Sequence, residues 1–341
     1  MARNQRIVWI DFSKVICIYL VVLGHALSYS VTNECYLRNF IYLFHLPVFF
    51  FVSGYLQHSA EKNFYAYFLT IVKSLIIPYI FLNILALFLK IPIYLYLHND
   101  FNSQLFYFLI GHGHAPAGPA WFLLCLFWIK FQMFFIIKLK DGMQLLCAFF
   151  YCLLAYYFPW HLYWDIDSSF MAMPIFIIGY QSKRHYSECI NRHYSSFMMG
   201  GIFIITFVIT FGFSLIQQKE AMFSRLFGTS GVLFYIAAIL GIVMIISLCK
   251  LLECFNSKYI MILSSGSIII MGLHGVFYGY TRAFLKMLNV IPSEYDYLIK
   301  IFVCVIVLVE MYFPIILLQR YCSVFIGGRK PKYIKIDTTD S

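Results

Sequence analysis

Apolar residues along this chain gather into ten runs that are separated by shorter polar segments. A helix needs about 20 apolar residues to cross the hydrocarbon layer of a membrane, and most of the runs approach that length. A backbone inside a bilayer must satisfy its own hydrogen bonds, which a helix does. The pattern predicts an all-α, polytopic membrane bundle of about ten helices with cytoplasmic N- and C-termini. The predicted spans are 7–30, 37–57, 68–89, 119–138, 143–159, 168–181, 196–216, 229–250, 260–280 and 297–319.

The segments between the spans are mostly short. The longest outer connection, 90–118, contains an apolar stretch at 101–111 that is too short to span, so we expect a re-entrant or interfacial helix there. No soluble domain is apparent. We expect one transmembrane domain over residues 1–326 and a short basic and polar cytoplasmic tail over 327–341.

The composition and the charge distribution fit a membrane protein. The chain is 62% hydrophobic and only 12% charged, which leaves too few polar residues to cover a soluble domain. Its net charge of +10 would by itself suit a nucleic acid. However, seventeen of the 25 Lys and Arg residues fall on the predicted inner side and only seven outside, the positive-inside asymmetry. We expect an integral membrane protein whose basic face meets anionic lipid and an anionic cofactor, with no nucleic acid partner.

The first predicted span carries three ionisable residues, Asp11, Lys14 and His25. Such side chains are costly inside a membrane and usually face a bundle interior or a watery cavity. Lys14 and His25 are eleven residues apart, so they share a helix face and lie roughly 16 Å apart along the axis. His25 can accept a proton from a hydroxyl group, Lys14 can bind a phosphate, and Asp11 can hold Lys14. The alternatives are a packing histidine, a snorkelling lysine and a structural salt bridge. We interpret this helix as one wall of a polar passage from a membrane surface towards the middle.

Other polar residues are candidates for the same passage. His45 and Ser53 lie in the second span and His274 in the ninth, and helix packing is the alternative for each. Lys73, at the inner end of the third span, is either a second phosphate contact or an interfacial anchor. Trp121 begins the fourth span at the outer face, where a tryptophan belongs either to a site or to the aromatic belt.

Two pairs of residues within the spans carry structural predictions. In the second span, Pro47 should kink the helix and Gly54 should let another backbone approach closely. Lys130 and Glu310 are charges in the middle of the fourth and tenth spans, and we expect them to pair with each other because buried charges usually do.

The sequence predicts no metal site. His112 and His114 lie in the outer loop, where we expect them to be solvated, and a two-histidine site would need further ligands. The ten cysteines show no CxxC pair, and most lie within spans, where cysteine behaves as a small apolar residue.

Several motifs resemble the acyltransferase-3 family of membrane acyltransferases, in particular its fucose 4-O-acetylase-like group. A basic residue, ten intervening positions and a histidine are that family's hallmark, and Lys14 and His25 fit it. Lysine stands where many members have arginine, which keeps the charge but loses the fork geometry. The stretches that carry the resemblance are WIDFSKVICIYLVVLGH (9–25), FHLPVFFFVSGYL (44–56), GPAWFLLCLF (118–127) and SGSIIIMGLH (265–274).

The resemblance implies an O-acetyltransferase that takes acetyl-CoA from the cytoplasm and acylates a hydroxyl group of a cell-envelope or exported glycan or glycolipid. We expect the CoA phosphates near the inner lysines and the thioester near His25, which acts as general base or takes the acetyl group transiently. The expected catalytic residues are His25, Asp11 and His45, the cofactor-binding residues are Lys14, Lys73 and Ser53, and the substrate-binding residues are Trp121 and His274.

Two other functions are alternatives for the same sequence features. A transporter or flippase of an envelope lipid or glycolipid would use buried polar groups as a translocation path. A membrane scaffold without a ligand explains the hydropathy but not the line of ionisable residues. The sequence predicts neither the identity of the acceptor nor an oligomeric state.

Overall fold

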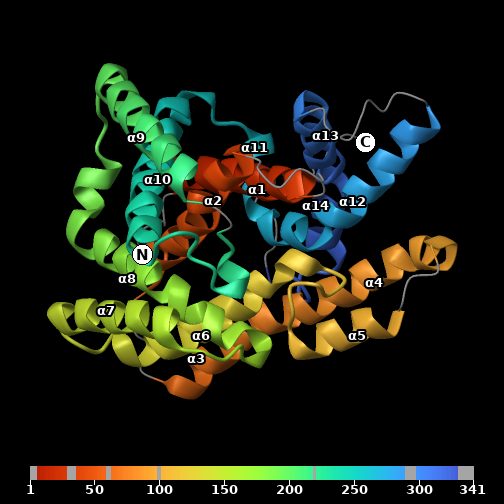
Figure 1. Cartoon of the computed structure of the whole chain (residues 1–341), viewed down its shortest axis with the longest axis horizontal. Coiled ribbons are helices and arrows are strands. Elements are labelled where there is room, and N and C mark those ends of the chain that lie inside the picture. Colours follow the sequence, from red (N-terminus) through yellow and green to blue (C-terminus); the bar gives the residue numbers. More distant parts are fainter. Residues whose placement is uncertain are drawn as a thin grey trace, which may run out of the picture.

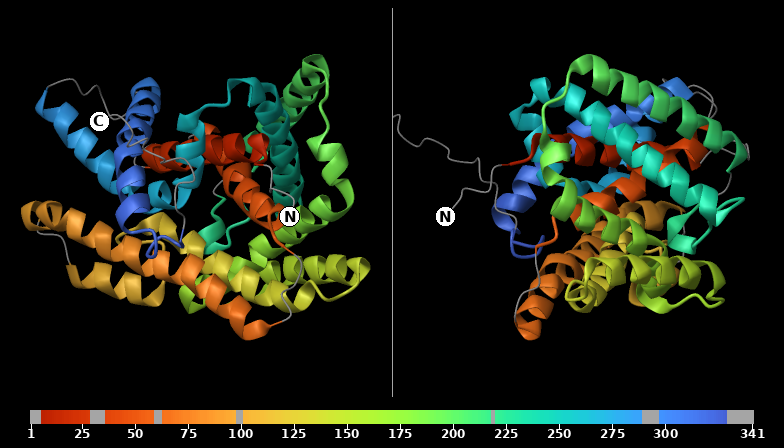
Figure 2. Two further views of the ribbon diagram at one scale, coloured as in Figure 1. Left: turned by 180° about the vertical axis from the view of Figure 1, so that it is seen from behind. Right: turned by 90° about the vertical axis from the view of Figure 1, so that its left-hand side faces the viewer.

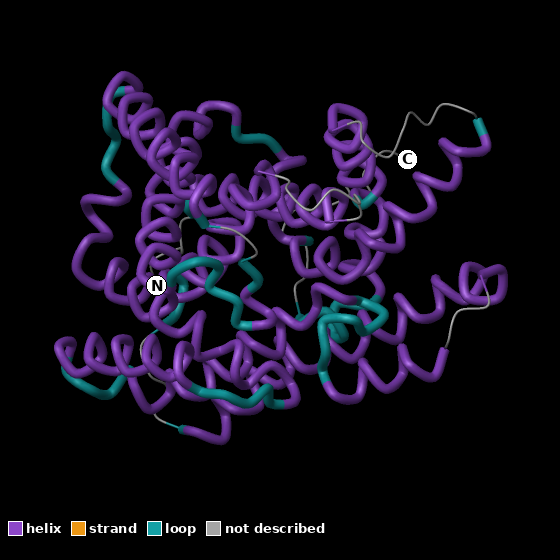
Figure 3. The backbone as a smooth tube through the Cα atoms, viewed as in Figure 1, coloured by secondary structure: helices purple, strands orange, loops and turns teal. Residues whose placement is uncertain are grey.

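The chain is mostly helical over the residues that its computed structural model describes, which are 6–28, 36–58, 63–97, 101–217, 220–288 and 297–328. Over these residues the only strand-like pairing is a single antiparallel bridge between Ala221 and Leu226. Figure 3 shows helices joined by short loops. The predicted all-α fold is therefore confirmed. The predicted tail, 327–341, lies outside the described residues except for Gly327 and Gly328.

The described residues form fourteen α-helices, and short 3-10 turns connect some of these helices. The 3-10 turns relevant to the cavity are Gly118–Ala120, Tyr163–Asp165 and Met222–Ser224. The helices are α1 (Val8–Ser28), α2 (Tyr36–Tyr55), α3 (Phe64–Ile71), α4 (Ile77–Leu97), α5 (Phe101–Ile110), α6 (Trp121–Ile136), α7 (Asp141–Tyr157), α8 (Ile166–Asn191), α9 (Ser196–Ile216), α10 (Gly231–Leu252), α11 (Lys258–Ser265), α12 (Ser267–Met287), α13 (Tyr297–Glu310) and α14 (Tyr312–Tyr321).

Eight helical segments of the described chain are long and apolar enough to cross a membrane. They correspond to eight of the ten predicted spans. The remaining two predictions, 143–159 and 168–181, fall on α7, which has 17 residues, and on α8, which has 26 residues and several charged residues towards its end. The exact number of spans stays a prediction. The apolar stretch predicted at 101–111 forms the ten-residue helix α5.

The third span is one continuous segment from Phe64 to Pro92 with a π-helical turn, Val72–Ile76, inside it. Pro78 explains the turn, because it has no N–H to donate to the carbonyl of Ser74. The residue before it, Ile77, donates its backbone N–H to the carbonyl of Val72. That carbonyl lies five residues earlier, which is the spacing of a π-helix. The turn carries Lys73, whose side chain is exposed.

Helix α1 occupies the centre of the molecule. It contacts α2, α10, α11, α12 and α13, and Figures 1 and 2 show it among the other helices from three directions. Its Cys17 and Ile18 are fully buried. A helix that is apolar on nearly all sides is expected to be surrounded by other elements, and α1 is.

Helices α2 and α8 cross at two glycines. A Cβ atom on Gly54 would lie 2.0 Å from the carbonyl oxygen of Phe176, and one on Gly179 would lie 2.1 Å from that of Phe51. Only glycine permits backbones to come this close, as small residues do at helix contacts in membranes. The close approach predicted at Gly54 is confirmed.

The predicted pairing of Lys130 with Glu310 is wrong. The Lys130 ammonium donates to the side-chain oxygen of Gln57 at 3.0 Å. The Glu310 carboxylate accepts from the hydroxyl of Thr281 at 2.8 Å. Each charge is held by a polar group on a neighbouring element, because α6 and α13 contact different parts of the bundle.

Candidate functional site

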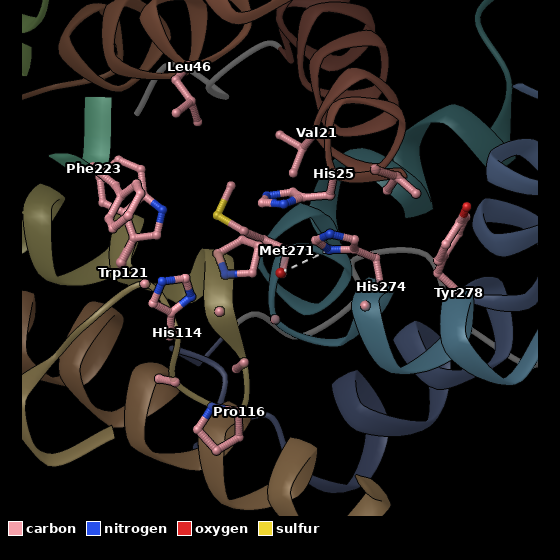
Figure 4. Close-up of a pocket in the computed structure, with 18 of the residues that line it drawn as sticks. Val21, His25, Leu46, His114, Pro116, Trp121, Phe223, Met271, His274 and Tyr278 are labelled. Atoms are coloured by element: carbon pink, nitrogen blue, oxygen red, sulfur yellow. Dashed lines mark hydrogen bonds between the residues drawn. The ribbon is translucent and has the colours of Figure 1, made fainter. Parts of the chain in front are cut away.

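A cavity of about 590 Å³ lies at one end of α1 and brings together four of the predicted site residues, His25, His45, Trp121 and His274. Its walls come from α1, α2, α4, α5, the loop before α6 and the start of α6, the segment around Phe223, and α12. The volume falls within the range of about 300–1,000 Å³ that is typical of small-molecule sites. Figure 4 shows the side chains that line it.

Two of the cavity histidines are held by their own helices. The His45 Nδ1 atom lies 2.7 Å from the carbonyl oxygen of Ile41. The His274 Nδ1 atom lies 2.9 Å from that of Ile270 and 3.1 Å from that of Met271. A carbonyl oxygen only accepts, so Nδ1 carries the proton in both rings, and in the neutral imidazole Nε2 is then a hydrogen-bond acceptor.

His25 differs from the other two because its ring nitrogens make no hydrogen bond to any residue that the structure describes. It is half-buried near the end of α1, and its ring centroid lies 5.3 Å from that of His274, with the planes tilted by 40°. An imidazole in a cavity without a structural hydrogen bond is available to a ligand. Among these three, His25 is therefore the histidine best suited to exchange a proton with a bound molecule.

The loop before α6 is fastened to α4 and carries Trp121 to the cavity. The amide N–H of Ala117 donates to the Asn83 side chain at 3.0 Å, and the Lys90 ammonium donates to the carbonyl of Pro116 at 2.7 Å. Trp121 begins α6 and is only 7% exposed. Its burial against the cavity favours the site interpretation over the aromatic belt.

Some cavity residues were not predicted from the sequence. His114, expected to be merely solvated, is exposed but lines the cavity. Arg38, Lys90 and Phe223 also line it, from α2, α4 and the segment before α10. The helix-breaking run GHGHAPAGPA (111–120), directly before Trp121, was the available signal for His114. No local signal marked the other three.

Asp11, Lys14, Ser53 and Lys73 do not line this cavity. Asp11 is 6% exposed and its carboxylate is bound by the Arg6 guanidinium and by the Ser264 hydroxyl. It ties the start of α1 to α11 and lies about four helical turns from His25. Asp11 thus lies outside the cavity, and its catalytic role stays a prediction.

The face of α1 between Lys14 and the cavity is packed. Lys14 is half-buried, and Cys17 and Ile18, one turn further along, have no exposed surface. The cavity lining begins on α1 at Val21. The polar passage predicted along this face is thus closed between residues 14 and 21 in this structure.

Glu220 lies directly before the cavity segment and is 1% exposed, and neither of its carboxylate oxygens has a hydrogen-bond partner within the described chain. Burial raises the pKa of this carboxyl from 4.5 to about 7, although the positive charge of Arg38 opposes the shift. The folded state therefore binds more protons than the unfolded state between these values, and stability falls as the pH rises through this window.

Glu220→Gln should remove this pH dependence. Thermal unfolding in detergent between about pH 4.5 and 7 should show wild-type stability falling relative to the variant, by at most roughly 1.4 kcal/mol per pH unit. Parallel profiles for the two proteins would contradict the buried, uncompensated carboxyl.

Comparisons with known proteins show which family this chain resembles. A family model described as an acyltransferase domain matches residues 7–316. The nodulation protein NolL of Mesorhizobium japonicum is 30% identical over 143 residues, which is 40% of this chain and 36% of that protein. The nodulation protein NolL of Sinorhizobium fredii is 30% identical over 157 residues, 44% of this chain and 40% of that protein. The chain thus matches well under half the length of each relative. No solved structure matches it.

Proposed function

The chain belongs to the acyltransferase-3 family, and from this premise we propose that it is a membrane O-acetyltransferase of the bacterial inner membrane. It moves an acetyl group from cytoplasmic acetyl-CoA to a hydroxyl group of a glycan or glycolipid. The observation that carries the proposal is the cavity with His25, His45, His274 and Trp121 in a chain that the family model matches almost throughout. The resemblance to the family is confirmed, while the fucose 4-O-acetylase-like group stays a prediction.

In the proposed reaction, His25 accepts the proton of the acceptor hydroxyl as its oxygen attacks the thioester carbonyl. The carbon–sulfur bond breaks, and the CoA thiolate leaves and takes up a proton. The Nε2 atoms of His45 and His274 accept hydrogen bonds from other hydroxyl groups and orient the acceptor. The alternative, in which His25 carries the acetyl group transiently, uses the same geometry.

The proposed donor site lies towards the other end of α1. The CoA phosphates contact Lys14 and Lys73, with Ser53 at the same end of α2, and the pantetheine arm extends towards His25 over roughly 16 Å. Since Cys17 and Ile18 are buried along this face, the arm reaches the cavity only when the packing around α1 opens. Donor binding in this proposal is therefore coupled to a movement of α1 against its neighbours.

Lys14→Ala should raise the apparent KM for acetyl-CoA by roughly tenfold or more and change kcat less, because a lost charged contact to a phosphate weakens donor binding. The measurement is the initial rate against acetyl-CoA concentration. Lys140→Ala removes an exposed lysine from the same predicted membrane side and should leave KM unchanged. Equal donor KM values for wild type and Lys14→Ala would remove Lys14 from the donor site.

Purified protein in liposomes tests the activity against the transporter alternative. Labelled acetyl-CoA on one side and a mixture of glycans and glycolipids should yield acetylated product without net movement of the glycolipid. Glycolipid movement without consumption of acetyl-CoA would support the transporter or flippase and overturn the proposal.

A further inference from the structure

A six-residue hairpin presents Phe223 to the cavity. The backbones of Ala221 and Leu226 exchange two hydrogen bonds of 3.0 Å, which closes the turn that contains Phe223. The carbonyl of Phe223 is fixed in addition by the hydroxyl of Ser168 on α8, at 2.9 Å. We call residues 221–226 the cavity hairpin. It begins immediately after the buried Glu220 and leads into α10.

Arg225 holds the cavity hairpin in a strained conformation. Its φ of 53° is in the left-handed region, which a residue with a side chain rarely adopts. The guanidinium donates to the Asp167 carboxylate at 2.8 Å and to the carbonyls of Phe158 and Trp160 at 2.6 and 2.8 Å. Such strain persists only where the surroundings over-determine the backbone, and it concentrates at ligand-binding sites. Here its effect is a fixed position for Phe223.

Phe223 completes an aromatic wall with Trp121 and His114. The Phe223 ring centroid lies 6.2 Å from that of Trp121 and 6.3 Å from that of His114. Gly113 makes room for it, because a Cβ there would lie 2.9 Å from the Phe223 ring. In Figure 4, Trp121 and Phe223 lie on one side of the cavity, across from His25 and His274.

The two sides of the cavity suit a ligand with one apolar face and a polar edge. Arg38 and Lys90 also line the cavity and disfavour a cationic ligand. A pure hydrocarbon chain would leave the Nε2 acceptors of the two fixed histidines without donors, which is costly. A closed pyranose ring has axial C–H groups that pack on aromatic rings and hydroxyl groups at its edge that donate to imidazole.

We propose that the aromatic wall is the acceptor subsite for a closed pyranose ring and that Phe223, held by the Arg225 anchor, determines acceptor specificity. This inference rests on the proposed function, because it assigns the binding site of the hydroxyl-bearing substrate in that reaction. The C–H face of the sugar lies on Trp121 and Phe223, and its hydroxyl edge faces His25 and His274. Phe223 acts on specificity and not on the chemical step.

Saturation-transfer NMR on the full chain in lipid nanodiscs tests the subsite without acetyl-CoA. The probes are neutral methyl hexopyranosides, and glucitol is the open-chain control with a similar set of hydroxyl groups. With the wild type, the ring C–H protons of at least one pyranoside should be saturated and those of glucitol should not. Phe223→Ala should reduce the pyranoside signal at least about fivefold, and Phe223→Tyr should retain it.

Leu226→Ala is the matched control, since Leu226 is 51% exposed on the same hairpin and does not line the cavity. It should leave the pyranoside signal unchanged. Arg225→Gly relieves the backbone strain but removes the anchor, so the pyranoside signal should disappear in this variant. No pyranoside signal, an equal signal for glucitol, or an unchanged signal in Phe223→Ala would overturn the subsite.

The same variants separate this inference from the proposed function. If acetyl transfer proceeds and Phe223→Ala leaves the acceptor KM unchanged, the subsite is wrong and the activity stands. If pyranosides bind at the wall and the wild type transfers no acetyl group, the activity is wrong and the subsite stands.

Discussion

Replacing His25 with alanine should lower the rate of acetyl transfer by about 10²–10⁴-fold, the range that general acid–base catalysis contributes. The His25 ring makes no hydrogen bond to the described chain, so its loss should disturb the fold little. The fixed histidines His45 and His274 cannot replace it, because their rings are bound to their own helices. The measurement is the single-turnover rate of acetyl transfer at saturating acetyl-CoA.

The control for this prediction is His185→Ala. His185 lies on α8 and pairs with Asp141 at the surface, with its side chain 44% exposed. Its replacement should leave the rate unchanged, and both variants should unfold at the wild-type temperature. Wild-type activity in His25→Ala would exclude the proposed mechanism. A mass shift of one acetyl group on His25 would identify transient acylation in place of general base catalysis.

Part of the cavity could be predicted because helical periodicity is a local property. The spacing of ionisable residues in the first span singled out His25, and the cavity contains it together with His45, Trp121 and His274. Phe223 could not be predicted as a cavity residue, because its position depends on Arg225 and on the contacts of Arg225 with distant parts of the chain. Tertiary placement of a loop leaves little trace in its own sequence.

The sequence was less informative about what packs on a helix face. Lys14 and His25 lie on one stripe of α1, yet the buried Cys17 and Ile18 interrupt it because neighbouring helices cover them. The partner predicted for Lys130 was also wrong, because the fold brings the side chain of Gln57 to its ammonium and not that of Glu310. Periodicity predicts which residues share a face, whereas the partners of that face are set by helix packing.

Replacing Gly54 with alanine should destabilise the folded protein by roughly 3 kcal/mol or more, at or above the upper end of the usual cost of overpacking. The new methyl group would lie 2.0 Å from the carbonyl oxygen of Phe176, a backbone atom that cannot rotate away as a side chain can. Helices α2 and α8 would have to separate, and α2 carries His45 into the cavity. Thermal unfolding in detergent and acetyl transfer should both decline.

Gly201→Ala on α9 is the matched control, because nothing lies within 4 Å of the Cβ it would add. It should be neutral or stabilise by up to about 1 kcal/mol, since alanine lowers the entropy of the unfolded chain. Equal stabilities of the Gly54 and Gly201 variants would contradict the close crossing of α2 and α8. Gly179→Ala places a methyl group at the same helix crossing, on α8 in place of α2. Once one methyl group has separated the backbones the second meets less resistance, so the double variant should lose less stability than the sum of the single variants.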